Sequence, residues 1–151
     1  MNSQSQATLA IRPYQVTDRD AVVLLWHDCG LVRPWNDPVA DITRKLTEQP
    51  ELFLVAHLEG VLVGTVMAGF EGHRGWINYL AVAPAKQRHA IGRALMTRVE
   101  ELLLARGCPK INLQIRASNS GVVSFYKSLG YSEDAVISLG KRLIIDEPPA
   151  A

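Results

Sequence analysis

The amino-acid sequence predicts an α/β domain built on a sheet of mixed sense. A strand, turn, helix and strand follow one another between Trp76 and Arg116, two hairpin signals precede this unit, and strand-like and helix-like periodicities alternate along the chain. Strands joined through a helix run parallel in a right-handed crossover, whereas strands joined by hairpins run antiparallel. The order of elements is therefore β, α, α, β, β, β, α, β, α, β, which gives both kinds of pairing.

A strand and two helices are predicted for the first fifty residues. Apolar residues alternate over 8–14, as in a half-buried strand. Thr17 begins a helix, and its spacing from Asp20 resembles a capping box. The second helix begins at Asp37 and Pro38, because Pro is favoured at the first helical position.

Three strands are then predicted from the apolar runs 51–58, 61–70 and 76–82. Glu59 and Gly60 form a hairpin turn signal between the first two strands, and residues 71–75 form the second connection.

The crossover helix and the final elements follow. One apolar stripe at helical spacing consists of Ile91, Leu95, Val99 and Leu102. Gly107 ends this helix, and residues 110–116 alternate like a further strand. The last helix extends from Asn119 to Gly130, and residues 131–143 are mostly extended, so we expect them to return to the sheet.

Length and composition limit the possible classes of protein. The 151 residues predict one domain over 8–145 with flexible tails at 1–7 and 146–151. A net charge of +1 argues against a nucleic-acid partner held by bulk electrostatics, and no apolar run is long enough to span a membrane. The N-terminus has no signal-peptide pattern, so we expect a cytoplasmic protein in which Cys29 and Cys108 are small buried hydrophobes. No metal site is predicted.

The turn before the crossover helix is the first functional candidate. A helix that starts there presents free backbone N–H groups and the positive end of its dipole, which together bind anions such as phosphate. Arg88, His89 and Arg93 add donors and positive charge. Taken alone, the turn has a plainer explanation, because many solvated crossover turns contain glycine and basic residues.

Two spaced motifs indicate a function for this turn that the turn alone does not. The first is Gln87-x-x-Ala90-x-Gly92, preceded by Ala81-Val82-x-Pro84. The second consists of Asn119, Phe125-Tyr126 and Leu129-Gly130-Tyr131. In this order and at this distance they resemble the acyl-CoA loop and the last helix of the GNAT N-acetyltransferase superfamily, and the resemblance extends from about Leu9 to Leu143.

The resemblance implies a GNAT-like acyl-CoA N-acyltransferase fold. Such a fold has a mixed, mostly antiparallel central sheet with a parallel, splayed strand pair and helices on both faces. The sequence departs from the family pattern at Ala90, which replaces the first motif glycine. A methyl group is tolerated there if φ is negative, as we expect at the start of a helix.

The resemblance also implies where acetyl-CoA binds, as cosubstrate and without a metal. The backbone of Leu80, Ala81 and Val82 would pair with the pantetheine arm where the parallel strands separate. The residues expected to bind the rest of the molecule, chiefly through N–H groups at the pyrophosphate, are Gln87, Arg88, His89, Ala90, Ile91, Gly92, Arg93 and Asn119. Asn119 has a second interpretation as a helix N-cap, and the two are compatible.

Catalytic roles follow from the same resemblance. Tyr126 would protonate the departing thiolate, although a buried Tyr on an amphipathic helix is more often part of the core. The oxyanion would be stabilised by a backbone N–H, and that of Leu80 is the most plausible donor. Some family members have a Glu where this chain has Trp76. Glu71 and His73 are candidate bases acting through water, and the alternative is that both are solvated turn residues.

The acceptor site is expected in the segment 31–38 and in the hairpin 71–76. Arg33, Trp35 and Asp37 are the candidate substrate residues. Trp35 is either a wall of the acceptor site or an aromatic plug over the core, and Asp37 either attracts a cationic amine or caps a helix.

The predicted function is transfer of an acetyl group from acetyl-CoA to a primary amine by a monomer or homodimer without nucleic-acid or membrane partners. The amine is a protein N-terminus, a lysine or a small molecule. The alternatives are a non-catalytic acyl-CoA-binding regulatory module on the same fold and, with less support, a nucleotide-binding domain.

Overall fold

The structure is a computed structural model that describes residues 8–87 and 90–146. Its elements, in chain order, are β1 (Leu9–Pro13), η1 (Val16–Asp18), α1 (Arg19–Asp28), α2 (Pro38–Lys45), η2 (Pro50–Leu52), β2 (Phe53–Leu58), β3 (Val61–Phe70), β4 (Gly75–Val82), η3 (Pro84–Lys86), α3 (Ile91–Ala105), β5 (Ile111–Leu113) and α4 (Ser120–Ser128).

The sheet has the order β1-β2-β3-β4-β5. The pairs β1–β2, β2–β3 and β3–β4 are antiparallel, and β4–β5 is parallel. Glu59 and Gly60 connect β2 to β3 with φ of 52° and 79°, as a tight hairpin turn requires. The predicted sheet of mixed sense is therefore confirmed.

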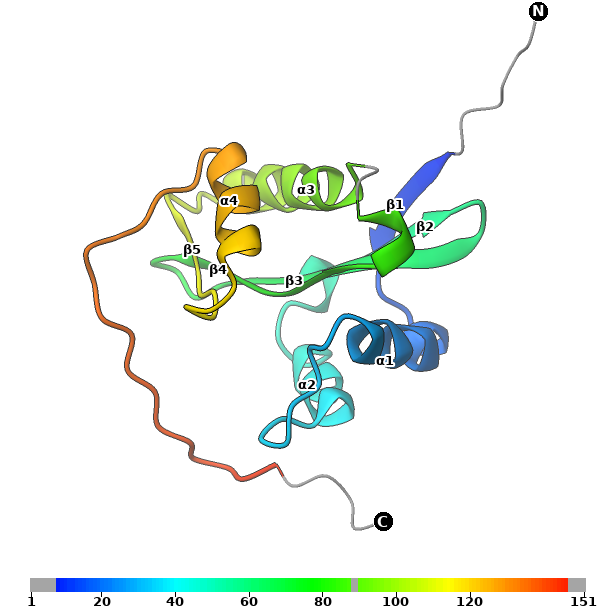
Figure 1. Ribbon diagram of the computed structural model, residues 1–151, viewed down its shortest axis with the longest axis horizontal. Helices are drawn as coiled ribbons and strands as arrows, with labels where there is room; N and C mark the ends of the chain where they lie inside the picture. The colour runs from blue at the N-terminus through cyan, green and yellow to red at the C-terminus, as the bar shows by residue number, and fades with distance from the viewer. Residues whose placement is uncertain (1–7, 88–89, 147–151) are drawn as a thin grey trace, which may run out of the picture.

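Helices cover both faces of the sheet, as Figure 1 shows. On one face, α1 and α2 enclose a core that includes the buried Trp26, Ile42 and Phe53. On the other face, α3 packs on β3 and β4 through Leu95 and Val99, and α4 adds Tyr126 to the same core.

The first helix begins later than predicted. Thr17 lies in η1, and α1 starts at Arg19. The reciprocal cap forms between Gln15 and Asp18, not between Thr17 and Asp20, and Asp18 Oδ2 accepts a 2.8 Å hydrogen bond from the backbone N–H of Gln15. The difference arises because Asp18 also binds Arg12 of β1 with two hydrogen bonds of 2.8 and 2.9 Å.

Two strand predictions were too long. Residues 51 and 52 belong to η2, so β2 begins at Phe53. The strand predicted over 110–116 is paired only at Ile111–Leu113. The chain leaves the sheet after Leu113, which opens the space beside β4 that is described below.

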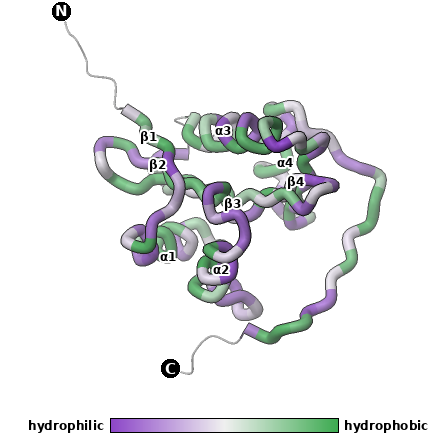
Figure 2. Tube along the Cα trace, turned by 180° about the vertical axis from the view of Figure 1, so that it is seen from behind, coloured by the Kyte–Doolittle hydropathy of each residue, from purple (hydrophilic) through white to green (hydrophobic). Residues whose placement is uncertain are grey.

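The expected return of residues 131–143 to the sheet was wrong. The segment after α4 runs outside the sheet and ends beside α2, where Arg44 binds Asp146 at 2.7 and 2.8 Å (Figure 1). Its apolar positions appear as green stretches in Figure 2, and six of them are exposed: Val136, Ile137, Leu139, Leu143, Ile144 and Ile145. These residues occur as one doublet, one single residue and one triplet, so they do not follow the strict alternation of a strand with one buried face.

Candidate functional site

The second half of β4 has a strand neighbour on one side only. Its register with β5 covers Gly75–Ile77, whereas its register with β3 extends to Val82. Residues 78–82 therefore lack a partner on the β5 side among the described residues, and this stretch contains the predicted Leu80, Ala81 and Val82. Unpaired strand backbone is a ready acceptor and donor surface for the amides of an extended ligand.

A bulge interrupts β4 at the start of this stretch. Thr65 pairs with Ala81 and Met67 pairs with Asn78, so Tyr79 and Leu80 both stand opposite the single residue between them in β3. Tyr79 adopts a φ of 50°, which is unusual for an aromatic residue.

The bulge changes which side chains face each helical layer. Asn78 and Tyr79 are adjacent in sequence but line the same groove, because the alternation of the strand is broken between them. Leu80 packs against the core beneath α3, and Ala81 lies in the core beneath α1. The bulge therefore brings two polar side chains to the α2 face of the sheet.

Buried hydrogen bonds hold the bulge in place. Trp26 Nε1 donates to Thr65 Oγ1 at 2.9 Å, and Thr65 Oγ1 donates to the carbonyl oxygen of Tyr79 at 2.9 Å. The Tyr79 ring also stacks on Trp26, with ring centroids 3.8 Å apart and an angle of 12° between the rings. Because Thr65 and Trp26 are fully buried, this arrangement belongs to the rigid core and not to a mobile loop.

The start of α3 lies next to the end of β4. A Cβ atom at Gly92 would be 3.7 Å from Val82 Cγ2 and 3.1 Å from Cζ of Phe125 in α4. The contact with Val82 would be an ordinary one, whereas the contact with Phe125 would require its ring to shift slightly. Gly92 thus brings the first turn of α3 close to both the open strand and the last helix.

Ile91, Gly92 and Arg93 supply the first N–H groups of α3, which have no acceptor inside the helix. The helix has neither a side-chain cap nor an acidic residue in its first turn. The expectation of a negative φ at Ala90 was wrong, because Ala90 has a φ of 59°. The left-handed geometry explains why glycine suits this position.

The remaining residues of the predicted loop are placed in part. The side chain of Gln87 donates a 3.2 Å hydrogen bond to the carbonyl oxygen of Val82, so it ties the loop to the end of β4. Arg88 and His89, which were predicted to bind the pyrophosphate, lie outside the described residues.

Tyr126 belongs to α4 and lies in the same core as the buried residues of α3. Its side chain is almost fully buried and packs edge-on against the rings of Phe125 and Tyr131. Burial raises the pKa of Tyr126 well above that of a free phenol, so the side chain keeps its proton at neutral and moderately alkaline pH. Its hydroxyl forms no hydrogen bond with the described residues and is not sealed from solvent, so it can donate to a ligand.

Asn119 caps α4. Its side-chain oxygen accepts a hydrogen bond from the N–H of Val122 at 3.4 Å, which confirms the N-cap interpretation. The carboxamide N–H₂ group is left for a ligand, so the second interpretation stays a prediction.

Glu71 and His73 lie in the β3–β4 hairpin, at the opposite end of β4 from the first turn of α3. Glu71 Oε1 accepts hydrogen bonds from the N–H groups of Arg74 and, at 2.5 Å, of His73. These bonds lower the pKa of Glu71 below its usual value and make it a weaker base. The hairpin ends at Gly75, which lies about 13 Å from Tyr79 along an extended strand. Glu71 and His73 would therefore act on an amine at the bulge through water.

The three predicted substrate residues lie in the α1–α2 connection. Asp37 caps α2 by accepting from the N–H groups of Val39 and Ala40 at 3.0 and 3.2 Å. The backbone N–H of Arg33 donates to the Asn36 side chain at 2.8 Å, which forms a tight turn.

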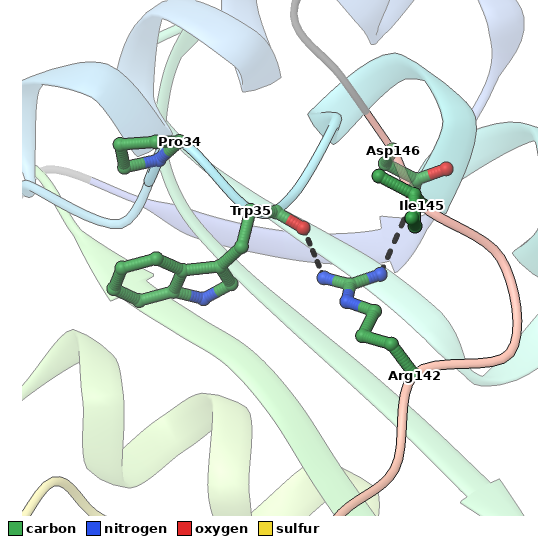
Figure 3. A pocket seen from close by; sticks show the side chains of 5 residues that line it. All are labelled: Pro34, Trp35, Arg142, Ile145 and Asp146. Carbon is green, nitrogen blue, oxygen red and sulfur yellow. Dashed lines mark hydrogen bonds and ion pairs between the residues drawn. The ribbon is translucent and has the colours of Figure 1, made fainter.

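Trp35 is 51% exposed, so it is not a plug over the core. It lines a surface cavity of about 290 Å³ with Pro34, Arg142, Ile145 and Asp146. Figure 3 shows Arg142 between the Trp35 carbonyl oxygen and Asp146. The C-terminal segment therefore braces this loop.

A second groove, of about 390 Å³, was not predicted. It lies between α2 and the bulge, and its lining residues are Asp41, Arg44, Lys45, Glu48, Met67, Asn78 and Tyr79. Tyr79 Oη donates a 2.5 Å hydrogen bond to Asp41 Oδ2 and accepts one of 2.8 Å from Asn36. In the sequence, Asp41 is only an acidic residue in the first turn of a helix, which is common for reasons of the helix dipole.

Other kinds of site are not evident in the part of the chain that the structure describes. No three metal-ligating side chains from residues 8–87 and 90–146 gather in one place. None of the described helices has both the length and the apolar character needed to cross a membrane.

Comparison with known proteins identifies the family. The model of the acetyltransferase (GNAT) family matches residues 19–131. An acetyltransferase of Yersinia enterocolitica is 49% identical over 139 residues, which cover 92% of this chain and 99% of that protein.

Solved structures share the fold. Ard1 from Thermoplasma volcanium has a TM-score of 0.74 at 25% identity, with 84% of each chain covered. The aminoglycoside acetyltransferase AAC(6')-Iy, solved with a bisubstrate analogue of CoA, has a TM-score of 0.75 at 18% identity, with 90% of this chain and 99% of that chain covered. The chain belongs to the GNAT family and is an acyl-CoA-dependent acetyltransferase.

Proposed function

We propose that this chain transfers an acetyl group from acetyl-CoA directly to a primary amine. The observation that supports this most strongly is the open side of β4 at Leu80–Val82 beside the uncapped first turn of α3. An extended ligand with amide groups and a diphosphate fits these two features together. The AAC(6')-Iy structure, which has the same fold, contains an analogue that joins CoA to an aminoglycoside.

The binding contacts are mostly made by the backbone. The N–H groups of Ile91, Gly92 and Arg93 face the diphosphate and benefit from the helix dipole. The open backbone from Leu80 to Val82 pairs with the pantetheine amides. Asn119 donates its carboxamide N–H to the same ligand while its oxygen caps α4. Because the backbone makes most of these contacts, the site tolerates Ala90 in place of glycine.

The reaction needs an oxyanion donor and an acid. The acceptor ammonium loses a proton to solvent, and the neutral amine attacks the thioester carbonyl. The N–H of Leu80, within the bulge, stabilises the negative oxygen. The C–S bond then breaks, Tyr126 protonates the thiolate, and a proton from the new amide nitrogen restores the phenol. Overall, the ammonium ion and acetyl-CoA give the amide, CoA and one proton.

Proton removal from the acceptor ammonium does not require a dedicated base, because solvent takes the proton. Glu71 and His73 are proposed to assist through water from the hairpin, in line with their exposure to solvent.

Two measurements test this function. Acetyl-CoA at a hundredfold excess over its dissociation constant should stabilise the fold by roughly 2.7 kcal/mol, measured as a rise in melting temperature. A screen of primary amines should show release of CoA with acetylated product. No melting shift at millimolar acetyl-CoA, or a shift without turnover on any amine, contradicts the proposal.

A further inference from the structure

We infer that Asp41 binds the acceptor as an ammonium ion and holds it beside the bulge of β4. This inference rests on the proposed function and adds the residue that recognises the acceptor. It also replaces Asp37 as the candidate anionic contact, because Asp37 is occupied as the cap of α2.

The position of Asp41 is the first argument. Asp41 Oδ2 accepts the hydroxyl of Tyr79 at 2.5 Å, and Tyr79 immediately precedes Leu80, the proposed oxyanion donor. The bulge of β4 therefore contributes both to the groove, through Asn78 and Tyr79, and to the open edge of the strand, through Leu80. A cation bound to Asp41 lies at the same point of the strand at which acetyl transfer is proposed.

The free charges of the groove are the second argument. Arg44 binds Asp146 at 2.7 and 2.8 Å and approaches Asp41 only at 3.5 Å. Lys45 donates to the carbonyl oxygen of Ala68, and burial lowers its pKa. Arg44 is thus bound mainly to Asp146 and Lys45 to a backbone carbonyl, so the Asp41 carboxylate is only weakly paired and remains to attract a positive ligand.

Asp41 has the capacity and the rigidity for this contact. Its side chain is 26% exposed, so it is accessible but largely desolvated. A carboxylate offers about four acceptor sites, and the bonds from Tyr79 and, at 3.5 Å, from Arg44 leave part of this capacity unused. Tyr79 is fixed in turn by Asn36 and by stacking on Trp26, so Asp41 is held in one position before the acceptor arrives.

The groove volume favours a small acceptor. A space of about 390 Å³ accepts an aminoalkyl chain or an amino-acid-sized molecule. The recognised chemistry is a primary ammonium group, which small amines and peptide N-termini share. The experiment therefore includes both classes of acceptor and compares their kcat/KM values.

The test measures amine KM, acetyl-CoA KM and kcat for the full chain and three variants. Asp41→Asn should raise the amine KM about 10- to 100-fold, because a charge-assisted hydrogen bond is lost, while the acetyl-CoA KM stays within twofold. Tyr79→Phe keeps the stacked ring and should raise the amine KM less. Glu48→Gln removes an exposed carboxylate of the same groove and is the matched control, with a change below threefold.

Inhibition separates recognition from a structural role. The trimethylammonium analogue of the best substrate cannot be acetylated, and its Ki should rise in Asp41→Asn but not in Glu48→Gln. Melting temperature and its shift with acetyl-CoA are measured for each variant to show that the fold and donor site are intact. Should Asp41→Asn misfold, Tyr79→Phe tests the position of the Asp41 carboxylate instead, and a smaller rise in amine KM and Ki is then the expected result.

The outcomes are distinct. A wild-type chain that acetylates no amine contradicts the proposed function. Wild-type turnover with an unchanged amine KM and Ki in Asp41→Asn contradicts the present inference alone. If Glu48→Gln raises the amine KM as much as Asp41→Asn does, general electrostatic attraction explains the binding of the amine without a specific contact, and the inference is wrong.

Discussion

The hydroxyl of Thr65 donates a 2.9 Å hydrogen bond to the carbonyl oxygen of Tyr79 beneath the bulge of β4. The Thr65 hydroxyl oxygen in turn accepts the indole N–H of Trp26 at 2.9 Å. A fully buried hydroxyl therefore connects the core of α1 to the strand residue that shapes the proposed transfer site.

We predict that Thr65→Val destabilises the protein and slows acetyl transfer. Valine has nearly the same shape but leaves a buried N–H and a buried carbonyl without a partner, at a cost of about 2–3 kcal/mol. Urea unfolding measures the stability, and kcat reports the position of the bulge. Thr43→Val, which removes an exposed hydroxyl from α2, is the control and should change stability by less than about 0.5 kcal/mol. Equal stability of Thr65→Val and the wild type would contradict this role.

Ala90→Gly should stabilise the protein. A left-handed backbone costs an alanine roughly 1–2 kcal/mol, and the greater freedom of glycine in the unfolded chain offsets about 0.5–1 kcal/mol of the relief. The net gain is up to about 1.5 kcal/mol in the free energy of unfolding, with no loss of acetyl-CoA affinity. Ala94→Gly, inside α3, should instead destabilise by about 1 kcal/mol. The same sign for both variants would be inconsistent with the observed φ of 59° at Ala90.

Tyr126→Phe should lower kcat by about 100-fold or more while the KM for acetyl-CoA stays nearly unchanged. The reason is that only the proton donor is lost, whereas the ring still packs in the core. Because burial raises the pKa of Tyr126, its acid form persists across neutral and moderately alkaline pH, and kcat should show no loss from this group up to pH of about 10.

Tyr131→Phe is the matched control for this prediction. Tyr131 is a neighbouring tyrosine whose hydroxyl donates to Glu100 at 2.6 Å. Its loss should reduce stability and leave kcat within a few fold. An unchanged kcat in Tyr126→Phe would remove Tyr126 from the mechanism.

Stability should fall in acid partly through Asp18. Hydrogen bonds from Arg12, and also that from Gln15, lower the pKa of Asp18 in the folded protein. Its stabilising contribution is therefore complete above the unfolded pKa of about 4 and is lost as pH falls through the lower folded value.

Asp18→Asn should cost about 2 kcal/mol at pH 7, and the difference from the wild type should shrink towards pH 3. Urea unfolding at both pH values measures it. Asp20→Asn changes an exposed carboxylate on the next turn and should have little effect at either pH. A constant difference between Asp18→Asn and the wild type at the two pH values would exclude the linkage.

The crossover unit could be predicted because its signals are local. Helical periodicity, the glycine at its end and the flanking apolar strands all lie within forty residues of one another. Asn119 and Asp37 were recognised as caps for the same reason, since a cap depends on its neighbours in the chain.

The bulge and the groove could not be predicted because they depend on distant contacts. Nothing about a tyrosine indicates a φ of 50° at position 79, which is supported by Thr65 and Trp26 from other elements. Asp41 becomes a site residue only through Tyr79, which lies 38 positions further along the chain. The expected return of residues 131–143 to the sheet was wrong for a related reason. The segment that follows α4 is held beside α2 by the ion pair between Asp146 and Arg44, which is distant in the sequence.

A crystal structure of the chain with bound CoA tests the central claim most directly. The account predicts a diphosphate within hydrogen-bond distance of the N–H groups of Ile91–Arg93 and a pantetheine arm along Leu80–Val82. Bound CoA elsewhere on the surface, with this corner empty or blocked by the methyl group of Ala90, would contradict it.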